Sequence, residues 1–277
     1  MSAPDLLDYS RRWPVRLTLA GVGLFLHLPL LVLVVMSFND SRQTTVWRGF
    51  TLRWYAKLAG NAELVAALGN SLAIAGLATI LGLLLGTLAA IALWRFRFPG
   101  LGLVYGAFTL PIVVPEIALG VAMLIFFARV LPWPQDLPWP LGLGPIVIAH
   151  VAFIFPFVAV VVRARLMTFN REAEEAARDL GAGPWRALVD IVIPHLRPSL
   201  VAGALLAFTL SLDDFVITFF TAGPDTVTFP VKVYSMVRFG ITPEINAVST
   251  LLLVLTVVLT AVALRVQALA GERLGTG

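Results

Sequence analysis

Long apolar stretches, interrupted by few charged residues, dominate the chain and predict helices that cross a membrane. A helix needs about 20 mostly apolar residues to span the hydrocarbon core of a bilayer. Six stretches reach this length, at about residues 15–37, 69–93, 101–128, 141–162, 198–221 and 245–264. Pro111 and Pro115 lie inside the third stretch and are expected to kink its helix. The pattern predicts an all-α polytopic membrane protein, and we interpret residues 1–277 as a single transmembrane domain.

The composition supports a membrane protein and argues against other classes. Hydrophobic residues make up 59% of the 277 residues, charged residues make up only 13%, and the mean hydropathy is +0.91. Soluble domains carry about 45–50% apolar and about 25% charged residues. A water-soluble enzyme and a disordered chain are therefore disfavoured. The absence of cysteine excludes disulfides, zinc–thiolate sites and cysteine nucleophiles.

The basic residues predict which side of the membrane each segment faces. With six spans and the N-terminus inside, thirteen of the 20 Lys and Arg residues fall in cytoplasmic segments and seven in outer ones. Cytoplasmic loops carry such an excess, so we expect both termini in the cytoplasm. The first span is too long for a signal-peptide core and is expected to be retained. We therefore interpret the net charge of +4 as a signal of membrane topology. We expect the chain to contact membrane lipid and no nucleic acid.

The segment 163–197 is the most charged stretch and predicts two short helices outside the membrane. Asn170 can cap a first helix over residues 171–180, whose early Glu residues favour the positive end of the helix dipole. Gly181 ends this helix. A second, amphipathic helix is expected over residues 185–193. A solvated loop is the alternative, but the strong helix formers favour a surface that docks a cytoplasmic partner.

This segment also contains a specific motif. Glu175-Ala176-Ala177 is followed by Gly181 and by Ile191-Val192-Ile193-Pro194. The run resembles the Glu-Ala-Ala loop of permease subunits of ATP-binding-cassette (ABC) importers, with every spacing kept and one Leu replaced by Ile193. In that family the loop forms the coupling helix, which sits in a cleft of the ATPase subunit. The resemblance implies that the ATPase contact is carried by Glu174, Glu175, Ala176, Ala177, Gly181, Ile191 and Pro194. We expect Pro194 to end the second helix.

The chain has no ATP-binding motif of its own. A phosphate-binding Gly-x-x-x-x-Gly-Lys loop needs a Lys after a Gly, and neither Lys57 nor Lys232 meets this condition. The ATPase would be a separate polypeptide that binds ATP and Mg²⁺. We expect no catalytic residue, metal or cofactor in this chain.

Three acidic residues, Glu116, Asp213 and Asp214, lie within the expected spans. A charged side chain in the middle of a membrane costs about 3 kcal/mol or more, so these acids should face a cavity, a pathway or a partner. Carboxylates suit a cationic solute, and the nearby aromatic rings of Phe215 and Tyr234 attract ammonium groups. We predict a substrate pathway lined by these five residues, and rank Glu116 and Asp214 before Asp213.

Other interpretations of the acids remain open. They could instead pair with Arg129, Arg238 or backbone groups at a helix break. An ion-coupled secondary transporter would use them as ion sites, but it would leave the coupling motif without a purpose. An intramembrane hydrolase would use them as acid and base, but no zinc or nucleophile motif accompanies them. We interpret His150 as a packed polar residue with a hydrogen-bonded neighbour.

Three further runs of residues indicate a particular group within this family of permeases. They are Leu110–Glu116, Ser211–Phe215 with Ala222-Gly223-Pro224, and Phe229–Arg238. They resemble permeases of spermidine/putrescine importers, most closely the second of the two permease subunits. The resemblance implies a type I importer (MetI-like) fold, alternating access, and a bacterial inner-membrane complex with a homologous second permease, two ATPases and a periplasmic polyamine-binding protein. Related permeases carry ferric ion, sulfate or thiamine, and the sequence does not separate spermidine from putrescine.

Overall fold

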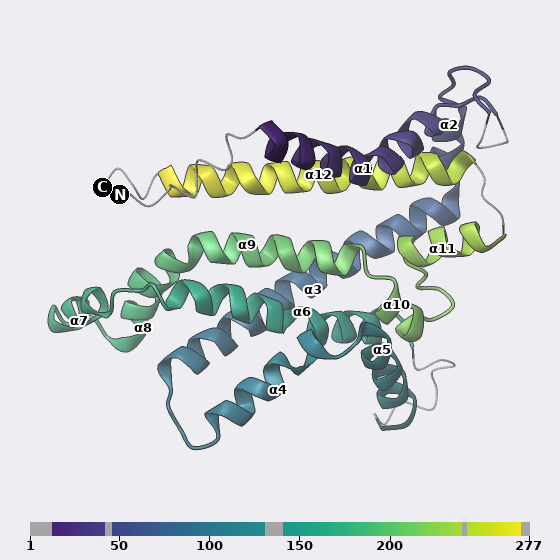
Figure 1. Ribbon diagram of the computed structural model, residues 1–277. Helices are drawn as coiled ribbons and strands as arrows, with labels where there is room; N and C mark the ends of the chain where they lie inside the picture. The colour runs from purple at the N-terminus through teal and green to yellow at the C-terminus, as the bar shows by residue number, and fades with distance from the viewer. Residues whose placement is uncertain (1–12, 42–45, 131–140, 240–242, 273–277) are drawn as a thin grey trace. The chain divides into compact units, whose positions relative to one another are not determined.

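The computed structural model describes residues 13–41, 46–130, 141–239 and 243–272. Over these residues the regular secondary structure is helical apart from an isolated bridge between Asn39 and Phe50, so the expected all-α class is confirmed (Figure 1). The chain divides into two compact units. The first is Met1–Asn61 with Ser235–Val254, and the second is Ala62–Tyr234 with Leu255–Gly277. The interpretation of residues 1–277 as one permease domain stays a prediction.

The first unit joins a long apolar helix to a short amphipathic one. Its elements are α1 (Trp13–Ser37), α2 (Arg53–Ala59), the end of α11 (Phe229–Phe239) and the first part of α12 (Pro243–Glu272). The buried indole of Trp54 donates a hydrogen bond to the carbonyl of Asn39 at 2.9 Å, which ties α2 to the segment after α1. Lys57 of α2 pairs with Glu244 at the start of α12. These contacts hold the connections between helices, while most of α1 stays exposed.

The core of the second unit is built by three helices that lie side by side (Figure 1). They are α3 (Ala62–Arg95), α6 (Leu143–Leu166) and α9 (Ile193–Leu212). Two glycines allow α3 and α6 to approach closely: a Cβ atom on Gly86 would lie 2.7 Å from the carbonyl oxygen of Phe155, and one on Gly82 would lie 2.8 Å from the side chain of Ile154. Small residues at such contacts let helix backbones pack tightly in lipid, where no hydrophobic force drives them together.

Within the described residues, five helices are long and apolar enough to cross a membrane, or six if one bent pair counts as a span. The bent pair corrects the expected single helix over residues 101–128. It consists of α4 (Leu101–Val113) and of α5 (Glu116–Ile125) with the π-helical turn η2 (Phe126–Val130), bent by 107°. Pro115 disfavours helical backbone at the residue before it, and Val114 is accordingly extended with ψ 132°. The kink expected there is a complete break.

The expected fifth span, residues 198–221, is broken as well. Helix α9 ends at Leu212, and a short helix α10 (Val216–Thr221) follows after three residues. Asp213 and Asp214 lie in this break, so both broken helices carry their acids where the helix is interrupted. After α10, helix α11 (Phe229–Phe239) precedes α12.

The charged segment 163–197 forms the first of its two expected helices as α7 (Arg171–Asp179). The side chain of Asn170 accepts a hydrogen bond from the Glu172 amide at 3.0 Å, and this confirms the N-cap. Gly181 follows the helix with φ +90°, a conformation that favours glycine.

The expected end of the second helix at Pro194 is wrong. Helix α8 (Pro184–Ala187), the π-helical η3 (Leu188–Val192) and α9 follow one another without a gap. Pro194 is the second residue of α9, directly after the π-helical turn. A wider π turn relieves the clash between a proline ring and the carbonyl four residues earlier, so the helix continues through the proline.

Candidate functional site

Glu116 and Asp213 form a pair of exposed carboxylates at the two helix breaks. Glu116 is the first residue of α5, and Asp213 follows the last residue of α9. The two breaks lie near each other in the fold, because the helices that follow them, α5 and α10, pack together. Among the residues that the structure describes, which include Arg129 and Arg238, neither acid forms an ion pair. We call Glu116 and Asp213 the carboxylate pair.

Asp214 has different surroundings, although it is the next residue. It is buried, with 8% of its surface exposed. Its Oδ1 accepts hydrogen bonds from the amide of Thr218 at 2.8 Å and from the Thr218 hydroxyl at 3.0 Å. Its Oδ2 accepts a longer bond from the Ile217 amide at 3.4 Å. Asp214 therefore satisfies the free amides at the start of α10, where a negative charge is favourable.

His150 of α6 completes this buried network. Its Nδ1 lies 2.7 Å from the Ser211 hydroxyl, its Nε2 lies 2.9 Å from the Thr218 hydroxyl, and Nε2 also lies 3.3 Å from Asp214 Oδ1. The interpretation of His150 as a packed, hydrogen-bonded residue is confirmed. The network links α6 to both sides of the break between α9 and α10. The ranking of Asp214 before Asp213 as a substrate residue therefore loses support, because Asp214 faces protein partners and Asp213 is exposed.

Aromatic side chains lie just beyond the carboxylate pair in the chain. The ring of Phe215 lies 4.6 Å from the ring of Tyr234 and 5.5 Å from the ring of Phe219, measured between centroids. Tyr234 and Phe219 remain about half exposed. Electron-rich ring faces of this kind attract ammonium groups. The structure thus brings Phe215 and Tyr234 together, as the predicted pathway requires. No group of three or more metal-binding side chains occurs in the described part of the chain.

Close packing holds the two broken helices against each other. A Cβ atom on Gly120 of α5 would lie 2.7 Å from the ring of Phe220 in α10. Helix α11 is anchored to α3, because the hydroxyl of Ser71 accepts a hydrogen bond from the Phe229 amide at 2.8 Å. Lys232 of α11 also pairs with Glu63 at the start of α3. The two contacts with α3 hold the helix that carries Tyr234. No sequence pattern predicts any of these contacts.

The coupling motif divides into exposed and buried residues. Glu175, Ala176 and Gly181 are exposed, and Ala177 is half-buried. Glu174 is buried with 7% exposure, and its Oε1 lies 2.8 Å from Arg95 Nη2 at the end of α3. Glu174 therefore contacts the chain's own bundle. Sequence reasoning missed Arg95 as its partner, because the two residues lie far apart in the chain.

Aromatic and cationic contacts reinforce this attachment. The guanidinium of Arg171 in α7 stacks on the ring of Trp94 at 4.7 Å, and Trp94 meets the edge of Phe169 at 5.7 Å. The charged first turn of α7 is thereby fixed on the end of α3. Just after α7, Leu180 is 90% exposed, and Trp185 of α8 is 75% exposed. Large exposed apolar side chains of this kind are typical of protein interfaces. Sequence reasoning did not single out Trp185.

Ile191 and Pro194 have a different setting from the rest of the motif. Both are half-buried within the continuous helical run of η3 and α9. Their positions connect the coupling motif directly to α9, which ends at Leu212, just before Asp213. The motif and the carboxylate pair thus share α9 as a common element of the second unit.

The arrangement of the helices has counterparts among solved structures. A chain of a bacterial ABC transporter that imports the acidic polysaccharide alginate is 15% identical, with a TM-score of 0.71 over 96% of this chain and 99% of that chain. A chain of the MetNI methionine ABC transporter is 20% identical, with a TM-score of 0.62 over 75% of this chain and 95% of that chain. The fold is therefore that of an ABC importer permease, of the MetI-like kind.

Sequence comparison identifies the family. Residues 82–276 match the family of binding-protein-dependent transport system inner membrane components, and the chain belongs to it. The putrescine transport system permease protein PotI of Escherichia coli (strain K12) is 43% identical over 245 residues, which cover 87% of this chain and 85% of that protein. The spermidine/putrescine transport system permease protein PotC of the same organism is 38% identical over 241 residues, which cover 87% and 89%. The protein is thus a permease subunit, a transport component of the inner membrane.

Proposed function

We propose that this permease subunit carries polyamines, with putrescine and spermidine as the solutes to test. Relatives that bear these names match most of its length. The observation that carries the proposal is the carboxylate pair, Glu116 and Asp213, exposed at two helix breaks without an ion-pair partner in the described residues. A polyamine presents ammonium groups separated by apolar segments, so two carboxylates and the rings of Phe215 and Tyr234 match its chemistry.

In this proposal the chain acts within a larger assembly. A homologous second permease would complete the pathway, and two ATPase subunits would bind ATP and Mg²⁺ in the cytoplasm. A periplasmic polyamine-binding protein would deliver the solute. The chain contributes no ATPase site of its own, and both of its termini lie in the cytoplasm. The exposed side chains of Glu175, Leu180 and Trp185 supply the surface for the ATPase.

The mechanism we propose is alternating access. Closure of the ATPase dimer on ATP displaces α7, and the ion pair of Glu174 with Arg95 passes this movement to α3. The continuous helix from Pro184 to Leu212 passes it to the break that holds Asp213. Movement at the two breaks changes the side from which the carboxylate pair is accessible, because an interrupted helix reorients more easily than one long helix.

The test is uptake of labelled putrescine and spermidine into proteoliposomes that hold this chain with its partner permease and ATPase. The binding protein is supplied outside, and ATP is trapped inside. ATP-dependent accumulation, reduced at least tenfold by Glu116→Gln in an intact complex, is the expected result. Stimulated ATP hydrolysis without accumulation of either polyamine would overturn the substrate but leave the permease class intact.

A further inference from the structure

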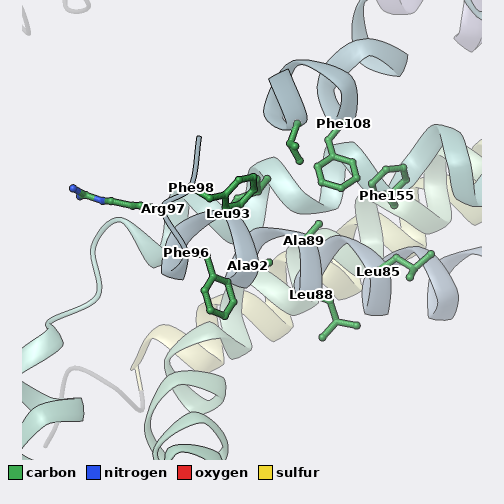
Figure 2. A pocket seen from close by; sticks show the side chains of 11 residues that line it. Leu85, Leu88, Ala89, Ala92, Leu93, Phe96, Arg97, Phe98, Phe108 and Phe155 are labelled. Carbon is green, nitrogen blue, oxygen red and sulfur yellow. The ribbon is translucent and has the colours of Figure 1, made fainter. Parts of the chain in front are cut away.

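An apolar groove opens between α3, α4 and α6 at the end of the bundle that carries α7 (Figure 2). Its volume of about 630 Å³ lies within the range of about 300–1,000 Å³ that small-molecule sites occupy. Eleven residues line it; ten are apolar, including Leu85, Ala92, Phe108 and Phe155, and the eleventh is Arg97. The groove is separate from the carboxylate pair and from the coupling motif.

The length of the groove matches one leaflet of a bilayer. Along α3 its lining extends from Leu85 to Leu93 and continues past the end of the helix to Phe98. From Leu85 to Arg95 helix α3 rises about 15 Å, at 1.5 Å for each of the ten steps between residues. The hydrocarbon core of a bilayer is about 30 Å thick, so this is half of it. A ligand of this site would therefore lie in the leaflet on the side of α7.

The rim of the groove carries positive charge. Arg97 extends away from the apolar lining and is exposed (Figure 2). In the part of the chain that the structure describes, Arg97 has no ion-pair partner. A second guanidinium, that of Arg163 at the end of α6, stacks on the ring of Tyr105 at 4.5 Å, next to the lining residue Val104. The site thus offers an apolar groove with the guanidinium of Arg97 at its rim and that of Arg163 nearby.

Helix α4 is poorly packed along the groove. None of its thirteen residues, all of which the structure describes, is buried. Helix α4 packs on α6 through the rings of Phe108 and Phe155, whose centroids are 5.6 Å apart, and makes few contacts with α3. The space between α4 and α3 is therefore open along the groove, and an apolar chain that entered it would contact both helices.

We propose that the groove binds an anionic phospholipid of the cytoplasmic leaflet, with an acyl chain along Leu85, Ala92 and Phe108 and the headgroup phosphate on Arg97. The assignment to the cytoplasmic leaflet rests on the proposed function, which places both termini in the cytoplasm. Arginine binds phosphate through two parallel hydrogen bonds, and basic pockets between membrane helices suit anionic headgroups. A helix of another permease subunit would have to bring its own carboxylate to Arg97, whereas the surrounding membrane supplies both the apolar chain and the anion. The bound lipid would fix α4 against α3.

The test is native mass spectrometry of the assembled transporter with added phosphatidylglycerol or phosphatidylcholine. Wild-type protein should retain phosphatidylglycerol preferentially. One cation near a membrane surface corresponds to about a fivefold change in affinity, so Arg97→Gln should reduce retention of phosphatidylglycerol about fivefold and barely change that of phosphatidylcholine. Ala92→Phe, which fills the groove, should reduce retention of both. Arg197→Gln, at an exposed arginine of α9 outside the groove, is the matched control and should change neither.

Equal retention of phosphatidylglycerol by wild type, Arg97→Gln and Ala92→Phe would overturn the proposal. So would a photo-crosslinker at Phe98 that captures the second permease and no lipid, since this would identify a protein as the occupant. Because lipid retention is measured without substrate, either failure is distinguishable from a failure of the proposed polyamine transport.

Discussion

The ion pair between Glu174 and Arg95 should determine how tightly ATP hydrolysis is coupled to transport. The change to make is Glu174→Gln, which keeps the size of the side chain and removes its charge. The two side chains are 2.8 Å apart, and both are largely shielded from solvent, with 9% of the Glu174 side chain and 31% of the Arg95 side chain exposed. A hydrogen bond to a charged group at such a site contributes about 1.5–3 kcal/mol. Arg95→Gln should have a larger effect, because it leaves the carboxylate of Glu174 buried without its cation.

This energy sets the expected size of the defect. We assume that the pair holds α7 on α3 while the ATPase dimer closes. Losing 1.5–3 kcal/mol then shifts the equilibrium toward a state with α7 detached from α3 by about 10- to 150-fold. The assay is labelled polyamine accumulated per ATP hydrolysed in proteoliposomes. We expect Glu174→Gln to lower this ratio at least tenfold while hydrolysis continues. Glu172→Gln, at an exposed acid of the same helix, is the matched control and should keep the ratio of the wild type.

A double-mutant cycle separates the pair from its two residues. If Glu174 and Arg95 act through each other, the variant that carries Glu174→Gln and Arg95→Gln together should be no worse than Arg95→Gln alone. A wild-type ratio in Glu174→Gln would refute the reasoning. Additive defects in the double variant would refute it too, because they would mean that the two residues act independently.

Three further outcomes are expected. Asp213→Asn should reduce polyamine uptake in a complex that assembles normally, whereas Asp214→Asn should lower the yield of folded complex; normal uptake by Asp213→Asn would exclude that residue from the pathway. Gly86→Ala should lower the free energy of unfolding by about 1–3 kcal/mol, because the added methyl group clashes with α6. Thermal unfolding measures this loss. Gly76→Ala is the control and should not lower the free energy of unfolding, because a Cβ atom there meets nothing within 4 Å. Gly181→Asp should strain the end of α7 by about 1–2 kcal/mol and release the ATPase on co-purification; full retention of the ATPase would count against the docking surface.

Local features of this protein could be predicted from the sequence because they depend on neighbouring residues. The cap at Asn170 and the helix end at Gly181 involve groups within a few positions of each other. The runs that can cross a membrane could be recognised in the sequence, because bilayer thickness sets a minimum apolar length. The Glu-Ala-Ala motif likewise indicated the permease class, since its spacing lies within a single segment of the chain.

Features that depend on distant contacts could not be predicted in the same way. Pro194 continues a helix because a π turn precedes it, and Glu174 is buried because α3 ends beside it. Asp213 and Asp214 are adjacent and chemically identical. Only the packing of His150 and of α10 against one of them decides which carboxylate is buried and which is exposed. The sequence by itself therefore determined the apolar runs, the membrane class and the presence of acids within those runs. The tertiary structure alone decided which acid is exposed and which is buried, because burial depends on residues brought together from distant parts of the chain.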